Sequence, residues 1–115
     1  MSYKIYDMSF SKVYPMLVAK AERKDRSRAE VDQVTTWLTG YSSTAIEEAL
    51  SSEVSYGDFF RQAPALNPKR HLITGPICGV KLTEIKEPLM QDIRYLDKLV
   101  DELAKGRPLE KIIRS

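Results

Sequence analysis

The chain has 115 residues, of which 43% are hydrophobic and 30% charged, a balance typical of one folded domain over residues 1–115. Its formal net charge of +2 is too small to indicate nucleic-acid binding by itself. A single cysteine and a single histidine exclude an intramolecular disulfide and the zinc or iron–sulfur motifs that need several such ligands.

Hydropathy along the chain argues against a membrane protein. No apolar run approaches the roughly 20 residues that a spanning helix requires. The N-terminal stretch "MSYKIYDMSF" also lacks the apolar centre of a signal peptide. We therefore expect a cytoplasmic protein without a membrane segment.

The charges are segregated along the sequence. Residues 29–60 contain six acidic residues and no basic one, whereas residues 61–81 contain four basic residues and no acidic one. The middle of the chain therefore contains one acidic stretch followed by one cationic stretch.

Two helices are predicted in the first third of the chain. Residues 10–24 place Val13, Leu17 and Ala21 on one face, and Pro15 favours a helix that begins just before it. Ser27 and Glu30 have the spacing of a capping box, which predicts a second helix with Gly40 as its C-terminal stop.

Two short helices are predicted next. Thr44 and Glu47 repeat the capping-box spacing before "AIEEALSS". Ser55 is the expected cap of a helix over "YGDFFRQA", which Pro64 ends. Phe59 and Phe60 of that helix are expected in the core.

Residues 63–80 are predicted to be an ordered loop rich in proline and glycine. The stretch "APALNPKRHLITGPICG" holds the only histidine, the only cysteine, three of the six prolines and two of the five glycines. Its prolines bias the residues before them toward extended conformations, so a continuous helix is excluded. One turn, or a short strand around "LIT", is compatible with this pattern.

The clearest element is one long helix over residues 88–105, with Pro88 at its first position and Gly106 as its stop. Its apolar residues are spaced four and three apart and predict a helix-packing seam, a candidate homodimer interface: Leu89, Ile93, Leu96, Val100 and Leu103. A short helix over "RPLEKIIR" follows. The expected fold is therefore mainly α, a compact orthogonal bundle of short helices with this long helix in its C-terminal half.

Several motifs together resemble a known family. The stretches "YDMSFSKVYPMLVAKAERK", "WLTGY", "DFFRQAPALNP", "LITGPICGV" and "PLMQDIRYLDKLVDELAKG" are similar to those of the bacterial domain-of-unknown-function family 2200. The resemblance covers nearly the whole chain and implies a small, stand-alone, mostly helical bacterial protein. It implies no activity and transfers no catalytic residue.

Candidates for catalysis are weak. Cys78 is a potential nucleophile with His71 as its base, but the sequence indicates no third, orienting group, and a buried thiol explains Cys78 equally simply. Asp97 and Asp101 share a helix face, where a cation or acid–base role competes with a solvated face partnered by Arg94, Lys98 and Lys105. No nucleotide fingerprint is present. We expect neither a cofactor nor a metal.

The cationic loop is the best candidate binding site in the sequence. Lys69 and Arg70 supply charge, Asn67 and His71 supply hydrogen-bond donors, and Gly75 permits the positive φ of an anion-binding nest. The competing interpretation is architectural, because Asn-Pro and Gly-Pro pairs are common turn formers.

Nucleic-acid binding is disfavoured. A helix junction carries the basic residues Lys20, Arg23, Lys24, Arg26 and Arg28. However, Glu30 and Asp32 begin the helix that would enter the groove, where they would repel phosphates. The sequence therefore favours a non-catalytic binding or protein-interaction module. The alternative is an enzyme or sensor for a small anionic metabolite at the Asn67–Gly75 loop.

Overall fold

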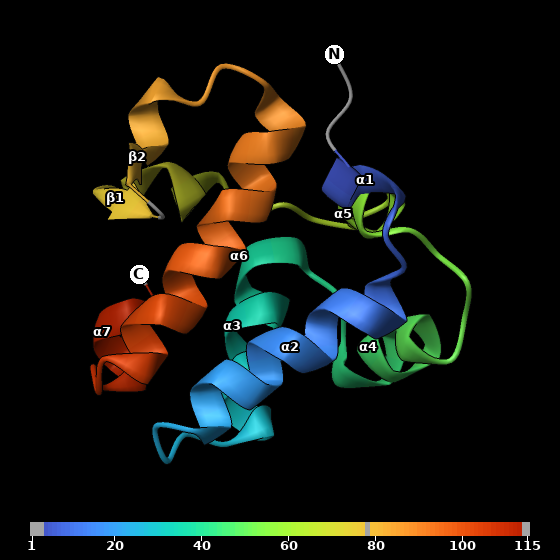
Figure 1. Ribbon diagram of the computed structural model, residues 1–115, viewed down its shortest axis with the longest axis horizontal. Coiled ribbons are helices and arrows are strands. Elements are labelled where there is room, and N and C mark those ends of the chain that lie inside the picture. Colours follow the sequence, from blue (N-terminus) through green and yellow to red (C-terminus); the bar gives the residue numbers. More distant parts are fainter. Residues whose placement is uncertain (1–3, 78, 114–115) are drawn as a thin grey trace.

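The computed structural model describes residues 4–77 and 79–113, and helices form most of it (Figure 1). In chain order the elements are α1 (Lys4–Asp7), α2 (Phe10–Glu22), α3 (Arg28–Thr39), α4 (Ser43–Leu50), α5 (Tyr56–Arg61), the 3-10 helix η1 (Pro68–Leu72), β1 (Pro76–Ile77), β2 (Val80–Lys81), the 3-10 helix η2 (Leu82–Glu84), α6 (Pro88–Ala104) and α7 (Leu109–Ile112). The predicted mainly α fold, with one long helix in the C-terminal half, is confirmed.

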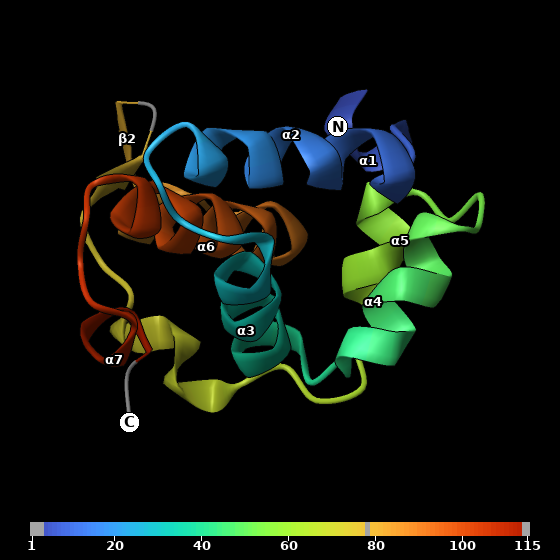
Figure 2. The same ribbon diagram turned by 90° about the horizontal axis from the view of Figure 1, so that it is seen from below.

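The main helices cross one another as an orthogonal bundle does. Figure 2 shows α2 and α6 side by side, with α3 running crosswise against both. The Cα radius of gyration is 13.1 Å, close to the about 13 Å of a compact domain of this length. None of the described helices combines the length and hydropathy needed to cross a bilayer.

Most predicted helix ends are confirmed, with one correction at α4. The Ser27–Glu30 capping box begins α3, and Gly40 ends that helix with a φ of +83°. The cap of α4 is Ser42, whose hydroxyl accepts a hydrogen bond from the Ala45 backbone N–H. The prediction of Thr44 was wrong because the chain is already helical at Ser43, so Thr44 lies inside the first turn.

The start of α2 is decided by contacts with a distant segment. An antiparallel bridge joins Ser9 to Ser55, and the Phe10 N–H donates to the Val54 carbonyl oxygen at 2.9 Å. These bonds begin the helix at Phe10, well before the start that Pro15 indicates. Pro15 therefore lies inside the helix, at an exposed position.

Aromatic side chains from α2 and α5 form the centre of the core. The Phe10 ring stacks on the Phe59 ring with centroids 4.0 Å apart and on the Tyr14 ring at 4.8 Å. Phe59 and Phe60 are buried as predicted. This aromatic cluster therefore joins α2 to α5.

The apolar stripe of α6 belongs to the same core, which corrects the candidate dimer interface. Ile93, Leu96, Val100 and Leu103 have no solvent exposure, and Leu89 is half-buried. The helix packs on α2 and α3 of its own chain. The spacing of the stripe was interpreted correctly as a packing seam, but its partner is intramolecular because α2 and α3 cover it.

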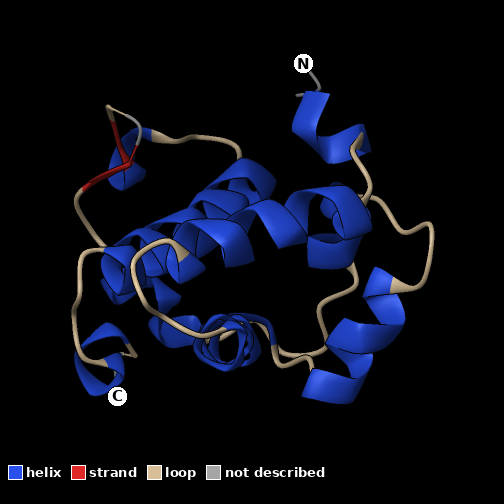
Figure 3. Cartoon of the chain, turned by 60° about the horizontal axis from the view of Figure 1, so that its bottom comes forward, coloured by secondary structure: helices blue, strands red, loops and turns tan. Residues whose placement is uncertain are grey.

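Residues 63–77 and 79–87, here called the crossing segment, connect α5 to α6. Figure 3 shows its short hairpin at the end of the molecule away from the N-terminus. Of the two alternatives left open here, one turn or a short strand around "LIT", the turn is present as η1, and the strand lies later, at Pro76–Ile77, paired with Val80–Lys81. The difference arises because η1 extends to Leu72 and Ile73 is its C-terminal cap.

Candidate functional site

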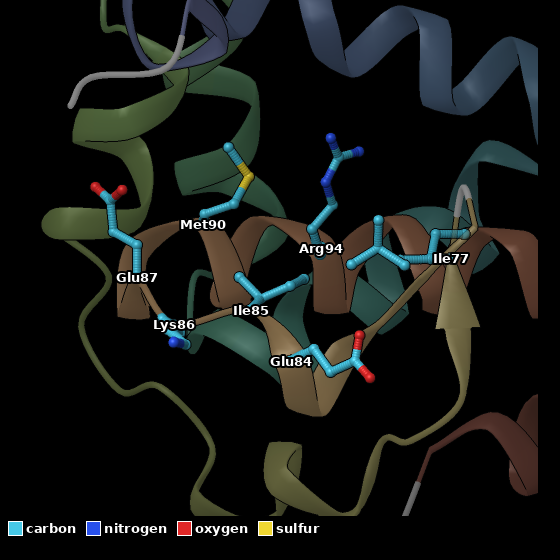
Figure 4. A pocket seen from close by; sticks show the side chains of 8 residues that line it. Ile77, Glu84, Ile85, Lys86, Glu87, Met90 and Arg94 are labelled. Atoms are coloured by element: carbon cyan, nitrogen blue, oxygen red, sulfur yellow. The ribbon is translucent and has the colours of Figure 1, made fainter.

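A pocket of about 520 Å³ lies between the first half of α6 and the crossing segment (Figure 4). Its apolar lining comes from Ile77 and Val80 of the hairpin, Ile85 after η2, and Met90 of α6. Its charged lining comes from Glu84, Lys86, Glu87 and Arg94. The crossing segment and the helix that directly follows it thus share one amphipathic cavity.

Side chains of α6 donate hydrogen bonds to the backbone of the crossing segment at two points. Lys98 Nζ donates to the Pro76 carbonyl oxygen at 3.0 Å, and Gln91 Nε2 donates to the Leu82 carbonyl oxygen at 3.3 Å. The Leu82 side chain is buried against the body. These contacts fix the segment on either side of the hairpin, so the pocket wall is held by hydrogen bonds as well as by packing.

Arg94 is the polar group on α6 that lines this cavity. Figure 4 shows its guanidinium extended from the helix on the same side as the Met90 side chain. Nη1 of Arg94 donates to Oδ2 of Asp97 at 2.9 Å, and the Arg94 side chain is 33% exposed. The carboxylate therefore orients a guanidinium that solvent can still reach.

Burial raises the pKa of Asp97, while the hydrogen bond and charge of Arg94 oppose that shift. The fully buried Tyr56 hydroxyl has no hydrogen-bond partner among the described residues. Burial raises the pKa of Tyr56 well above its usual range, and the charge of Asp97 raises it further. Arg94 and Asp97 thus form an ion pair beside the buried Tyr56, in which the Asp97 side chain is 17% exposed and the Arg94 side chain 33%.

The rim of the pocket carries both signs of charge. Glu84 and Lys86 are exposed and Glu87 is half-buried. Within the described part of the chain, none of these three side chains forms an ion pair. The rim charges are therefore solvated, in contrast to the oriented Arg94.

Two residues of the predicted anion site, Asn67 and Arg70, form hydrogen bonds within the fold. Arg70 pairs through Nε with Asp92 Oδ1 at 3.0 Å and donates through Nη1 to the Asn67 carbonyl oxygen at 3.0 Å. Asn67 Nδ2 donates to the Trp37 carbonyl oxygen at 3.2 Å, and Asn67 Oδ1 accepts from the Lys69 backbone N–H at 2.9 Å. Arg70 and Asn67 therefore join the crossing segment to α3 and α6.

The other three members of that predicted site are differently placed. The Lys69 side chain is exposed, with no ion pair among the described residues. His71 Nδ1 lies 3.2 Å from the Tyr95 hydroxyl. Gly75 has the positive φ expected of it, +98°, but it lies beside the Lys98 side chain. Anion binding at these residues stays a prediction.

The carboxylates predicted to share a helix face are separately paired. Asp97 contacts Arg94, whereas Asp101 lies 3.4 Å from Lys20 Nζ and 3.0 Å from Lys105 Nζ. Burial alone would raise the pKa of Asp101, but the hydrogen bond from Lys105 and the two ammonium charges leave it lowered. Because Asp97 and Asp101 are held in separate ion pairs, they stabilise the fold and do not form one acid–base pair.

Other sequence candidates are absorbed by the fold or lie outside the description. Arg26 binds Glu30 and donates to the Leu103 and Arg107 carbonyl oxygens, so it joins α3 to the end of α6. The proposed His71–Cys78 pair cannot be placed, because Cys78 lies outside the described residues. Across residues 4–77 and 79–113, no group of three or more potential ligands is arranged to hold a metal ion.

Sequence analysis missed the pocket residues. Met90 and Arg94 are four positions apart on α6, so their shared face was detectable. The opposing wall was not, because nothing local indicates that Ile77 and Ile85 lie over that face.

These features define a class: a small orthogonal helical protein with an amphipathic pocket beside its longest helix. The chain belongs to family 2200 of the domains of unknown function, described as an uncharacterized protein conserved in bacteria, whose model matches residues 4–114. It is also similar to a solved structure, the crystal structure of uncharacterized protein SP1917. That similarity has 54% sequence identity and a TM-score of 0.93, and it covers 97% of this chain and 92% of the other. No curated protein matches the chain.

Proposed function

We propose that this protein is a non-catalytic binding module of the bacterial cytoplasm, and that the pocket between α6 and the crossing segment is its binding site. The observation that carries the proposal is the pocket lining, in which aliphatic side chains from two elements line the same cavity as a guanidinium paired with Asp97. Such a combination gives a ligand both apolar contact and a fixed polar anchor.

The size and chemistry of the pocket support this proposal. Small-molecule sites are typically about 300–1,000 Å³ and mostly apolar with a few placed polar groups, and this cavity measures about 520 Å³. Its described lining includes no serine, threonine, cysteine or histidine side chain. The described lining therefore supports binding through apolar contact and charge.

The test is a fragment titration followed by chemical-shift mapping. Fragments with apolar bodies are expected to perturb the backbone resonances of Ile77, Ile85 and Met90 first. Val80→Ser, at a position 47% exposed, should weaken binding several-fold. Leu72→Ser is the matched control, because Leu72 is also an exposed aliphatic residue of the crossing segment, at 57%, but does not line the pocket.

Shifts confined to a second groove, lined by Trp37, Leu109 and Ile113 among others, would contradict the assignment of the site. Equal effects of Val80→Ser and Leu72→Ser would also contradict it.

The small-anion alternative at Asn67–Gly75 has less support, because Asn67, Arg70 and His71 already have partners within the fold. Homodimerisation stays a prediction as well, and it needs a surface other than the buried stripe of α6.

A further inference from the structure

We propose that the ligand of this pocket is a small aliphatic monocarboxylate, with its carboxylate on Arg94 and its chain along Ile77, Ile85 and Met90. The inference rests on the proposed function and adds the ligand class to it.

Arg94 supplies the anchor for the carboxylate. A guanidinium carries five N–H donors in a planar fork that matches a carboxylate, and the hydrogen bond to Asp97 occupies Nη1. Donors therefore remain for a ligand. Since Asp97 already orients the side chain, less conformational entropy is lost when a second carboxylate binds.

The lining indicates an aliphatic chain. Ile77, Val80, Ile85 and Met90 provide no aromatic ring on which a planar ligand would stack. This side of the lining extends from Glu87, the N-cap of α6, to Arg94 (Figure 4). This is about 10 Å along the helix axis, the length of an extended chain of about eight carbons. A flexible chain fits a strip of this form better than a compact ring system does.

The surrounding charges limit the ligand to a single negative charge. Glu84 and Glu87 line the same cavity as Arg94, with Lys86 between them in sequence. A second negative charge on a ligand would find only solvated rim charges of both signs and no second oriented guanidinium on the described lining, so phosphates and dicarboxylates gain no further anchor. An alkylamine is the competing ligand. It would have to rely on the solvated carboxylates of the rim, which interact weakly because water screens them.

The experiment compares octanoate, octanol, octylamine and succinate, each titrated into the whole protein by calorimetry and by chemical-shift mapping. We expect octanoate to bind most tightly and succinate to bind least. Arg94→Gln should weaken octanoate binding by about ten- to a hundredfold, the usual range for a charged hydrogen bond. It should change octanol binding by no more than about twofold, because octanol carries no charge.

Two further variants keep the test decisive if Arg94→Gln does not fold. Glu84→Gln removes one repelling carboxylate from the exposed rim and should tighten octanoate binding about two- to threefold while weakening octylamine. Glu48→Gln, at an exposed glutamate that does not line the pocket, is the matched control and should change neither.

Tighter binding of octylamine than of octanoate would overturn the ligand class and leave the pocket as a binding site. Octanoate binding that is insensitive to both Arg94→Gln and Glu84→Gln would also overturn it. Fragments that map to the pocket while none of these four compounds binds would contradict this inference alone. If neither the fragments nor the four compounds perturb the pocket, the proposed function fails with it.

Discussion

The helical body and the crossing segment are stabilised in different ways. In the body, side chains of α2, α3, α5 and α6 pack on one another continuously, with Phe10 and Phe59 stacked at the centre. In the crossing segment, three single buried residues are separated by more exposed stretches. The buried residues are Ile73, Ile77 and Leu82. Hydrogen bonds from Gln91 and Lys98 to its backbone, at Leu82 and Pro76, also hold the segment.

This difference explains where the pocket forms. Close packing leaves few cavities in a helical core. A segment that is attached at separate points can stand away from the helix between them, and Ile85 and its neighbours do so beside α6. Polar residues of the segment, such as Arg70, serve mainly as attachment points, whereas the pocket uses a cation of the body, Arg94.

The largest expected effect is in the body. Phe59→Ala removes a ring that stacks on both Phe10 and Tyr41, so we expect it to lower the free energy of unfolding by about 3–5 kcal/mol. Met16→Ala, at a residue 54% exposed on α2, should stay within about 0.5 kcal/mol. Urea denaturation measures both. Similar losses for the two variants would contradict the described core.

The next effect lies where the body meets the crossing segment. A Cβ at Gly40 would lie 2.8 Å from the Ala65 Cβ and 2.9 Å from the Ala65 backbone nitrogen. Gly40→Ala should therefore cost about 2–5 kcal/mol from the left-handed φ and the steric overlap together. Gly106→Ala has a similar φ but open space around it, and should cost about 1–2 kcal/mol. Thermal unfolding separates the two cases, and equal losses would mean that Ala65 moves aside freely.

Within the crossing segment, replacing each of two adjacent cations should have different effects on the free energy of unfolding. Arg70→Ala leaves the buried Asp92 without its ion pair, and we expect a loss of about 1–3 kcal/mol. Lys69→Ala, at the exposed neighbour, should change stability by less than about 0.5 kcal/mol. Denaturant titration of both variants provides the comparison. A larger loss at Lys69 would reverse the assignment of Arg70 as the attachment point.

Two tyrosines of the core provide a smaller contrast. The Tyr14 hydroxyl donates to Asp32 at 2.6 Å and lies 3.1 Å from the Thr35 hydroxyl. Tyr14→Phe should cost about 1–2 kcal/mol, because Asp32 loses a hydrogen bond. Tyr56→Phe removes a buried hydroxyl that has no partner among the described residues, so it should be neutral or stabilising by up to about 1 kcal/mol. A clear loss for Tyr56→Phe would show that its hydroxyl supports the Arg94–Asp97 pair.

The smallest effect concerns acid stability. The side-chain hydrogen bond from Arg26, followed by the Ser27 backbone N–H, lowers the pKa of Glu30 from 4.5 to about 2. Because the folded pKa is depressed, Glu30 stabilises the fold above about pH 4.5 and that contribution is lost as the pH falls toward about 2. Glu30→Gln should be less stable at neutral pH, with a shallower loss of stability across this window. Unfolding curves at stepwise pH measure it, and parallel profiles for the two proteins would contradict the assignment.

Local patterns predicted many helix ends but not all of them. Ser27 with Glu30, Ser55, and Pro88 with Gly106 were interpretable because a cap depends on residues within one turn. Thr44 with Glu47 matched the capping-box spacing, whereas Ser42 is followed three residues later by Ala45, so the local pattern favoured Thr44. In the structure the helix begins at Ser43 with Ser42 as its cap, and α4 packs on α2 and α3.

The candidate site was less predictable than the helices. Lys69 and Arg70 attracted attention because they cluster in a proline-rich loop, yet Arg70 is neutralised by Asp92, a residue 22 positions later. Arg94 was interpreted as part of a solvated face with Asp97. Its role depends on Ile77 and Ile85 lying opposite, which helical periodicity on α6 cannot reveal.

The sequence by itself therefore determined the family, the mainly α fold, the long helix and the apolar face of that helix, because these depend on residue periodicity and capping over a few turns. The tertiary structure decided what the face packs against and which cations stay available. An apolar stripe has the same spacing whether it meets its own chain or a second copy, and a charge is neutralised by neighbours in space, whatever their distance along the chain.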